Sequence, residues 1–274
     1  MELYQNGRSS PKAIIRCINK IIIMSLKCLL LIFLIIPCAL HAQNAIFVDQ
    51  GKIRFEKKTN LYDQMQEDGN DGNSSWTELA KKSMPHFKID YFDLLFTKNK
   101  TMYQAGPANP DNDKIPDWIS IPENKAVYSD LDNEKTIIQK AIFEDLFLIQ
   151  DSTRRIRWKI TDETRTIAGF NCRRANALIM DSVYVVAFYT DEIPTTGGPE
   201  SFCGLPGMIL GVAIPHQHMS WFATSVQAVP VSETEFKIPA KGKKNTRKEL
   251  NATLNDRMKD WGKSGKRYLL LTMI

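Results

Sequence analysis

The sequence has few of the residue patterns from which catalytic and metal sites are commonly built. It contains no His-Glu-x-x-His helix motif, no Gly-x-Ser-x-Gly nucleophile motif and no glycine-rich phosphate loop. His216 and His218 would lie on one strand face near Asp191 and Glu192, which is a possible beginning of a zinc site. A closed zinc site needs more ligands at fixed positions. We therefore expect no catalytic residues, no metal and no cofactor.

Cysteine is scarce in the part of the chain that we expect to fold. Five cysteines occur, but only Cys172 and Cys203 lie beyond residue 42. Two cysteines in an exported chain commonly form a disulfide, and this one would tie a strand to the segment just before Gly204. The alternative is a nucleophilic or redox cysteine, which would need a histidine or a Cys-x-x-Cys partner to lower its pKa. Neither is present beside these residues, so we expect a disulfide between Cys172 and Cys203.

Residues 1–42 have the pattern of an N-terminal extension followed by a secretory signal peptide. An apolar run at residues 29–36 follows Lys27, and a small-residue cleavage site follows at residues 39–42. Met24 is a second candidate for the true start, which would make the residues before it an upstream extension. The pattern predicts a protein exported to the periplasm or associated with the outer membrane, with one domain over residues 43–274.

Two other interpretations of the leader remain open. Residues 21–40 are almost long enough to cross a bilayer as a retained anchor, although Lys27 interrupts the run and Pro37 breaks its end. Cys38 suggests a lipid-modified N-terminus, although the proline directly before it fits such a processing site poorly.

The mature chain has almost no excess of either charge. The whole sequence has 36 basic and 31 acidic residues, and removing the five basic and one acidic residue of the leader leaves 31 and 30, a net charge of +1. A strongly basic domain would have pointed to nucleic acid or to an anionic membrane. We expect no nucleic-acid partner.

Strand patterns follow one another at short intervals, with no long helix between them. Residues 52–58 alternate apolar and charged side chains, and residues 87–103 regain strand character after a polar excursion at 60–73 and one or two helical turns at 76–82. Close spacing favours an antiparallel meander, because only antiparallel neighbours can be joined by tight turns. Further strands are expected at 127–131, 136–143, 146–150, 155–161, 165–168, 172–180, 183–190, 208–214 and 218–229.

The C-terminal region has helical periodicity instead. After a basic linker at residues 241–244, Thr246 and Glu249 form a capping-box pattern. Apolar residues then recur at helical spacing up to Trp261, and Gly262 suits a C-terminal stop. We expect this helix to pack on the sheet. Peripheral contact with a membrane or a partner is the alternative, because its other face is basic. The apolar tail at 268–274 is expected to add an edge strand or to remain loose.

The most structured connection in the chain is the segment 191–211, between two apolar strands. Pro206 and Gly207 predict a type II turn, because proline presets φ at the second turn position and glycine accepts the positive φ of the third. A loop of this length within a compact domain is either functional or a structural clamp.

This segment resembles the signature of the GLPGLI family, exported proteins of diderm bacteria. Residues 188–194 read FYTDEIP and residues 198–210 read GPESFCGLPGMIL, in which Met208 replaces the usual leucine. Residues 51–56 and 158–175 contain further family landmarks, so the resemblance covers nearly the whole mature chain. It implies no established activity and no catalytic residues.

Together these patterns predict a mainly β domain with a large curved antiparallel sheet, similar to the half-barrel of LolA-like periplasmic lipoprotein carriers, and a C-terminal helix packed on it. The expected function is non-catalytic binding of an apolar ligand (lipid, lipopeptide or peptide) on the concave face. The alternatives are an interaction component that docks an envelope membrane protein and, least supported, an envelope hydrolase or metalloenzyme. The expected ligand or partner loop comprises Tyr189, Ile193, Pro194, Gly198, Pro199, Phe202, Gly204, Leu205, Pro206 and Gly207.

Overall fold

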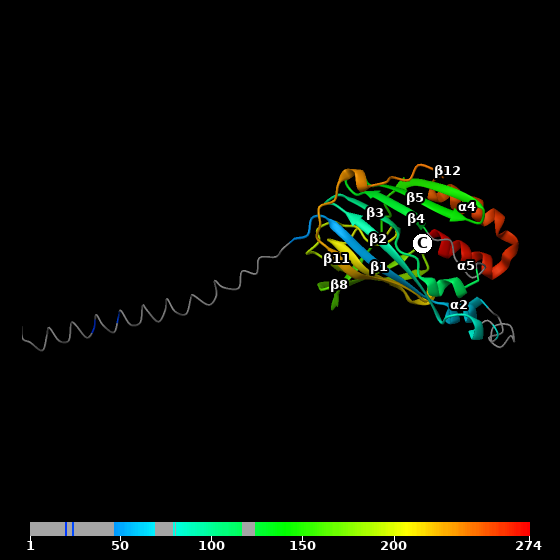
Figure 1. Ribbon diagram of the computed structural model, residues 1–274, viewed down its shortest axis with the longest axis horizontal. Coiled ribbons are helices and arrows are strands. Elements are labelled where there is room, and N and C mark those ends of the chain that lie inside the picture. Colours follow the sequence, from blue (N-terminus) through cyan, green and yellow to red (C-terminus); the bar gives the residue numbers. More distant parts are fainter. Residues whose placement is uncertain (1–19, 21–23, 25–46, 69–78, 80, 117–123) are drawn as a thin grey trace, which may run out of the picture. The chain divides into compact units, whose positions relative to one another are not determined.

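A computed structural model describes residues 20, 24, 47–68, 79, 81–116 and 124–274 (Figure 1). The residues Phe47–Ile274 form one compact unit. Apart from residues 20 and 24, the expected signal peptide at residues 1–42 lies outside the described residues, and so do most of the expected helical turns at 76–82.

The compact unit is built on one 12-stranded sheet in the order β12-β6-β5-β4-β3-β2-β1-β11-β10-β9-β8-β7. β12 pairs parallel with β6, and the other pairings between described strands are antiparallel. The strands are β1 (Gly51–Asn60), β2 (Phe87–Phe96), β3 (Lys100–Ala105), β4 (Asn124–Asp130), β5 (Lys135–Ile142), β6 (Asp145–Ser152), β7 (Lys159–Ile167), β8 (Phe170–Ile179), β9 (Val183–Thr190), β10 (Met208–Ile214), β11 (Met219–Gln227) and β12 (Lys243–Asn245).

The sheet is strongly curved, as the sequence predicts. β7 lies at one end of the strand order but also contacts β11, so the sheet coils on itself there (Figure 1). Tight hairpins make this possible: Ala168 and Gly169 both have positive φ between β7 and β8, the combination that type I′ turns require. Met180 and Asp181 repeat the combination between β8 and β9. The mainly β, largely antiparallel fold class is confirmed.

β7 differs from the expectation of two short strands at 155–161 and 165–168. The structure has a single strand whose register with β8 shifts between Ile160 and Thr164. The polar pair Asp162 and Glu163 therefore lies within an irregular stretch of a continuous strand and does not form a turn. β-bulges of this kind bend a strand without ending it.

The C-terminal region contains two helices where one was expected. α4 (Arg247–Arg257) begins with the predicted capping box, in which the Thr246 hydroxyl accepts from the Glu249 backbone N–H and the Glu249 carboxylate accepts from the Thr246 N–H. Leu250 and Leu254 are buried, but Trp261 is 50% exposed, so the expected apolar stripe ends at Met258. The expected stop at Gly262 is wrong, because that residue begins the next helix.

The tail folds as α5 (Gly262–Met273), after the short η5 (Lys259–Trp261), and the expectation of a strand or loose tail at 268–274 is wrong. α4 lies against β6 and β12, and α5 lies against α4 (Figure 1). The linker expected at 241–244 contributes β12 to the sheet edge. Among the described residues, no helix has the length and apolar character needed to cross a membrane.

The half of the sheet that contains β2 to β6 has an apolar cluster on each face. The interior cluster contains Phe55, Leu94 and Tyr103 together with the buried leucines of α4. Leu95, next to Leu94 on β2, points the other way into a smaller cluster. Phe236, from the segment after β11, covers this second cluster.

The polar excursion at 60–73 is partly helical and partly buried, contrary to the expectation. Its described part forms α2 (Leu61–Asp68), and Leu61 is only 2% exposed. Leu61 packs with Met84 and with Ile115, which follows the short η1 (Pro110–Lys114). Tyr62 and Met65 of the same helix pack partly against this cluster, so three apolar side chains anchor the polar segment.

Candidate functional site

The connection between β9 and β10, residues 191–207, crosses the interior of the curved sheet to reach the strands of its other half. We call it the central loop. The Thr195 hydroxyl donates to the Thr97 carbonyl at 2.8 Å, just after β2. Gly197 lies so close to β3 that an added Cβ would come within 2.6 Å of the Thr101 side chain. The central loop therefore joins the two halves of the sheet from within.

Backbone hydrogen bonds fix the shape of the central loop. Gly204 N–H donates to the Thr196 carbonyl at 3.0 Å, and Ile209 N–H donates to the Gly197 carbonyl at 2.9 Å. Met208 N–H donates to the Ile193 carbonyl at 2.9 Å. Satisfied backbone groups are what a buried, non-repetitive segment requires.

The prediction of a type II turn at Pro206 and Gly207 is wrong, because the hydrogen bond that closes such a turn is not formed. A type II turn would join Met208 N–H to the Leu205 carbonyl. Here Met208 bonds to Ile193, and it is Gly207 N–H that donates to Leu205, at 2.8 Å. The positive φ expected of Gly207 is present, at 141°.

Most of the residues expected to contact a ligand or partner face the interior. Ile193, Phe202 and Leu205 are exposed by 0%, 2% and 1%, and the ring centroids of Phe202 and Trp221 lie 6.2 Å apart. Burying side chains of this size contributes about 1.5–3 kcal/mol each. The buried residues of the expected set are Tyr189, Ile193, Gly198, Pro199, Phe202, Leu205 and Gly207, and the exposed ones are Pro194, Gly204 and Pro206.

Buried polar contacts hold the middle of the central loop. The Asn124 amide donates to the carboxylate of Glu200, which is 6% exposed and has a positive φ of 53°. The Trp158 indole N–H donates to the Cys203 carbonyl at 2.9 Å. Polar groups that are bonded in this way avoid the cost of burial and fix one arrangement of the chain.

The expected disulfide is not present, and both cysteines are free and buried. The Cys172 thiol faces the Phe170 carbonyl on β8 at 3.6 Å, whereas the Cys203 thiol faces the Arg154 carbonyl at 3.4 Å. The two sulfurs thus point at different elements. Burial raises the pKa of Cys172 to about 12, and burial also raises the pKa of Cys203 despite the nearby cations. Neither thiol has the lowered pKa of a reactive cysteine.

Arg154, whose carbonyl faces the Cys203 thiol, is half-buried and fixes the end of the C-terminal helix. Arg154 donates to the carbonyls of Met273 and Ile274, at 2.7 and 3.2 Å. Burial, followed by the positive charge of Arg247, lowers the pKa of Arg154 to about 10. Arg154 therefore keeps its charge at neutral pH. A cation at the end of a helix is favourable, because the last carbonyls carry partial negative charge.

The histidines and acids considered for zinc do not form a cluster. His216 is exposed on the short η3 (Pro215–Gln217), and His218 lies 3.5 Å from Asp63, which belongs to α2. The described residues contain no group of three or more side chains placed to hold a metal ion.

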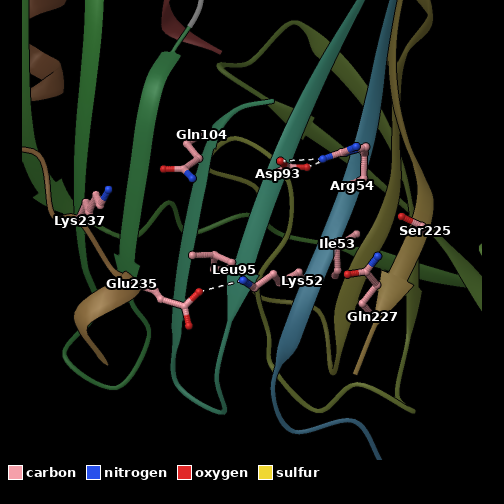
Figure 2. A pocket seen from close by; sticks show the side chains of 10 residues that line it. All are labelled: Lys52, Ile53, Arg54, Asp93, Leu95, Gln104, Ser225, Gln227, Glu235 and Lys237. Carbon is pink, nitrogen blue, oxygen red and sulfur yellow. Dashed lines mark hydrogen bonds and ion pairs between the residues drawn. The ribbon is translucent and has the colours of Figure 1, made fainter. Parts of the chain in front are cut away.

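A groove of about 380 Å³ lies over β1, β2, β3 and β11, where no expected site residue lies. We call this groove the outer groove. One of its walls is the segment after β11, which contains η4 (Glu233–Glu235). Figure 2 shows the 10 residues that line it: Lys52, Ile53, Arg54, Asp93, Leu95, Gln104, Ser225, Gln227, Glu235 and Lys237.

Two ion pairs cross the outer groove (Figure 2). Lys52 Nζ lies 2.8 Å from Glu235 Oε2, which ties the wall to β1. Arg54 donates from Nε and Nη2 to the two carboxylate oxygens of Asp93, at 2.8 and 3.0 Å. The hydrogen bond that Glu235 accepts from Lys52 lowers the pKa of Glu235, and the hydrogen bond that Arg54 donates to Asp93 raises the pKa of Arg54. Glu235 and Arg54 therefore stay charged at neutral pH.

The one local signal for the outer groove was a second capping box. The Ser232 hydroxyl and the Glu235 carboxylate satisfy each other's backbone N–H groups at the start of η4. The Ser-x-x-Glu pattern is readable in the sequence. The pattern predicts that Glu235 lies in a fixed turn, but no pattern in the neighbouring sequence indicates that this turn contacts β1.

Comparisons with known proteins give a family match over part of the chain. Residues 178–211 match a family model described as "Protein of unknown function (Porph_ging)". The matched stretch contains the signature at residues 188–210 on which the GLPGLI resemblance rests. No curated protein matches the chain.

Two solved structures of PNGF-II match part of the chain. The structure in space group C2 has a TM-score of 0.46 and the one in P21 a TM-score of 0.47, both at 14% sequence identity. Each match covers 72% of this chain and 31% of the PNGF-II chain. The chain thus matches about a third of the length of those structures, and we carry nothing from them to its function. Over residues 178–211 the chain is similar to a family of unknown function.

Proposed function

We propose that the chain is an exported, non-catalytic binding module of the cell envelope that contacts a protein partner through its outer surface. The observation that carries this proposal is the central loop inside the curved sheet. Ile193, Phe202 and Leu205 fill the concave side with buried side chains. An apolar ligand in that place would have to displace them.

Export is supported by the leader pattern at residues 1–42, and binding at the surface is supported by the outer groove. Clefts that combine a few polar groups with a fixed framework are common binding sites. The floor of this groove is a sheet, which favours a rigid site that changes little on binding.

Native mass spectrometry and site-specific crosslinking test the proposal together. Protein purified without detergent is expected to have the mass of the chain alone, with no apolar small molecule that is lost on denaturation. A photo-crosslinking amino acid at Ser225, in the outer groove, is expected to join one discrete envelope protein. The same substitution at the exposed Thr164 on β7 is the control and is expected to give no such product.

Two outcomes would contradict the proposal. One is a reproducible lipid or lipopeptide in the native spectrum, which would restore the apolar-ligand carrier. The other is an equal crosslinking pattern from both positions, which would show that the outer groove has no specific partner.

A further inference from the structure

The outer groove has one positive charge that no described residue neutralises. Lys52 and Arg54 are paired with Glu235 and Asp93. Lys237, on the wall of the groove, forms no ion pair with any residue of the described chain. Three cations against two carboxylates leave the lining with a net charge of +1. A ligand that complements this lining carries a negative charge.

The groove also presents two side-chain amides. Gln104 on β3 and Gln227 on β11 both line it, and neither side chain has a hydrogen-bond partner among the described residues. Figure 2 shows Gln104 on the same side as Lys237, with Gln227 on the opposite side of β1. Each amide has two N–H donors and a carbonyl acceptor. That combination matches the N–H and C=O groups of a peptide backbone.

The shape and the lining favour an extended peptide over a sugar or a base. None of the 10 lining residues is aromatic, so the groove has no platform on which a ring could stack. Its floor crosses four neighbouring strands, which lie about 4.8 Å apart, a span that an extended segment of roughly four to six residues covers at about 3.3 Å per residue.

We propose that the outer groove binds an extended acidic segment of the partner protein. A carboxylate of that segment pairs with Lys237, and its backbone hydrogen-bonds to Gln104 and Gln227. The ion pairs of Lys52 and Arg54 hold the floor and the wall in place and leave Lys237 to select the ligand. This inference rests on the proposed function, because it names the chemistry of the partner at the same site.

Fluorescence anisotropy with three labelled eight-residue peptides tests the inference. The probes alternate serine with glutamate, with glutamine or with lysine, and the full protein is titrated at low and at high salt. The glutamate peptide is expected to bind about tenfold more tightly than the glutamine peptide, and added salt is expected to reduce the difference. The lysine peptide is expected not to bind.

Variants locate the site. Lys237→Glu is expected to abolish the preference for the glutamate peptide, and Gln104→Ala is expected to weaken both the glutamate and the glutamine peptide. Lys263→Glu makes the same charge change at an exposed position on α5 and is expected to bind like the unaltered protein. Circular dichroism checks that each variant keeps the β fold.

Equal affinity for the glutamate and glutamine peptides would overturn the inference, and so would an unchanged preference in Lys237→Glu. An oligogalacturonate that binds through Lys237 while the glutamate peptide fails would assign the site to an acidic sugar. Any of these results with Ser225 crosslinking intact rejects only the acidic peptide. Loss of position-dependent crosslinking rejects the proposed function itself.

Discussion

Replacing Gly207 by alanine is expected to destabilise the protein by about 3–5 kcal/mol. A Cβ at this position would lie 2.0 Å from the Thr190 carbonyl oxygen and 2.7 Å from its carbon. Both are backbone atoms at the end of β9, so no side-chain rotation relieves the contact. The φ of 141° adds strain for any residue with a side chain.

Gly204→Ala is the matched control for this prediction. Gly204 belongs to the same loop and has a φ of 89°, but a Cβ there would have no other atom within 4 Å. The expected cost is the conformational strain alone, about 1–2 kcal/mol. Equilibrium urea unfolding of both variants measures the difference. Similar costs for the two would show that β9 does not confine the chain at Gly207.

Replacing Phe202 by alanine is expected to cost about 3–5 kcal/mol, because it empties a site in a closely packed interior. The side chain is 2% exposed and packs edge-on against Trp221, so it has lost almost all contact with water. The change is measured as a lower urea midpoint at an unchanged denaturant dependence.

Pro206→Ala is the control for Phe202→Ala, and the two variants together show whether the central loop packs in the interior or docks a partner. Pro206 is exposed in the same loop, and its replacement is expected to change stability by less than about 0.5 kcal/mol. A Phe202→Ala protein that unfolds like the unaltered one but no longer binds its partner would reverse our interpretation. It would make the central loop a docking surface whose aromatic residue becomes exposed on binding.

Local patterns predicted the frame of this fold well. β9 and β10 have the bounds that the apolar runs at 183–190 and 208–214 predict, since polar and glycine-bearing segments end both of them. The capping box at Thr246 also occurs as predicted. In these places a turn or a cap is determined by neighbouring residues, so the sequence is sufficient.

The sequence-based predictions are wrong where contacts between residues distant in the sequence determine the structure. A short apolar run such as 268–274 fits a strand or a buried helix equally well, and packing against α4 selects the helix. The cysteines could be counted but not placed, and their sulfurs face different elements. The outer groove joins β1 to Glu235, which follows it by more than half the chain, so no window of sequence contains it.

The candidate loop itself was recognised, but not the direction in which it points. Its glycines and prolines mark a shaped connection. Only the three-dimensional structure shows that Ile193, Phe202 and Leu205 turn inward, because an apolar side chain in a loop can serve a core or a partner.

Amide hydrogen exchange tests most directly whether the central loop fills the interior of the curved sheet. The N–H groups of Gly204, Met208 and Ile209 all donate to backbone carbonyls of the loop or its borders. If the loop fills the interior, these amides exchange only when the whole domain unfolds, with the same opening free energy as the strands around them. Exchange of the three amides within minutes at neutral pH, while the strands stay protected, would show a loop that opens alone and would contradict a filled interior.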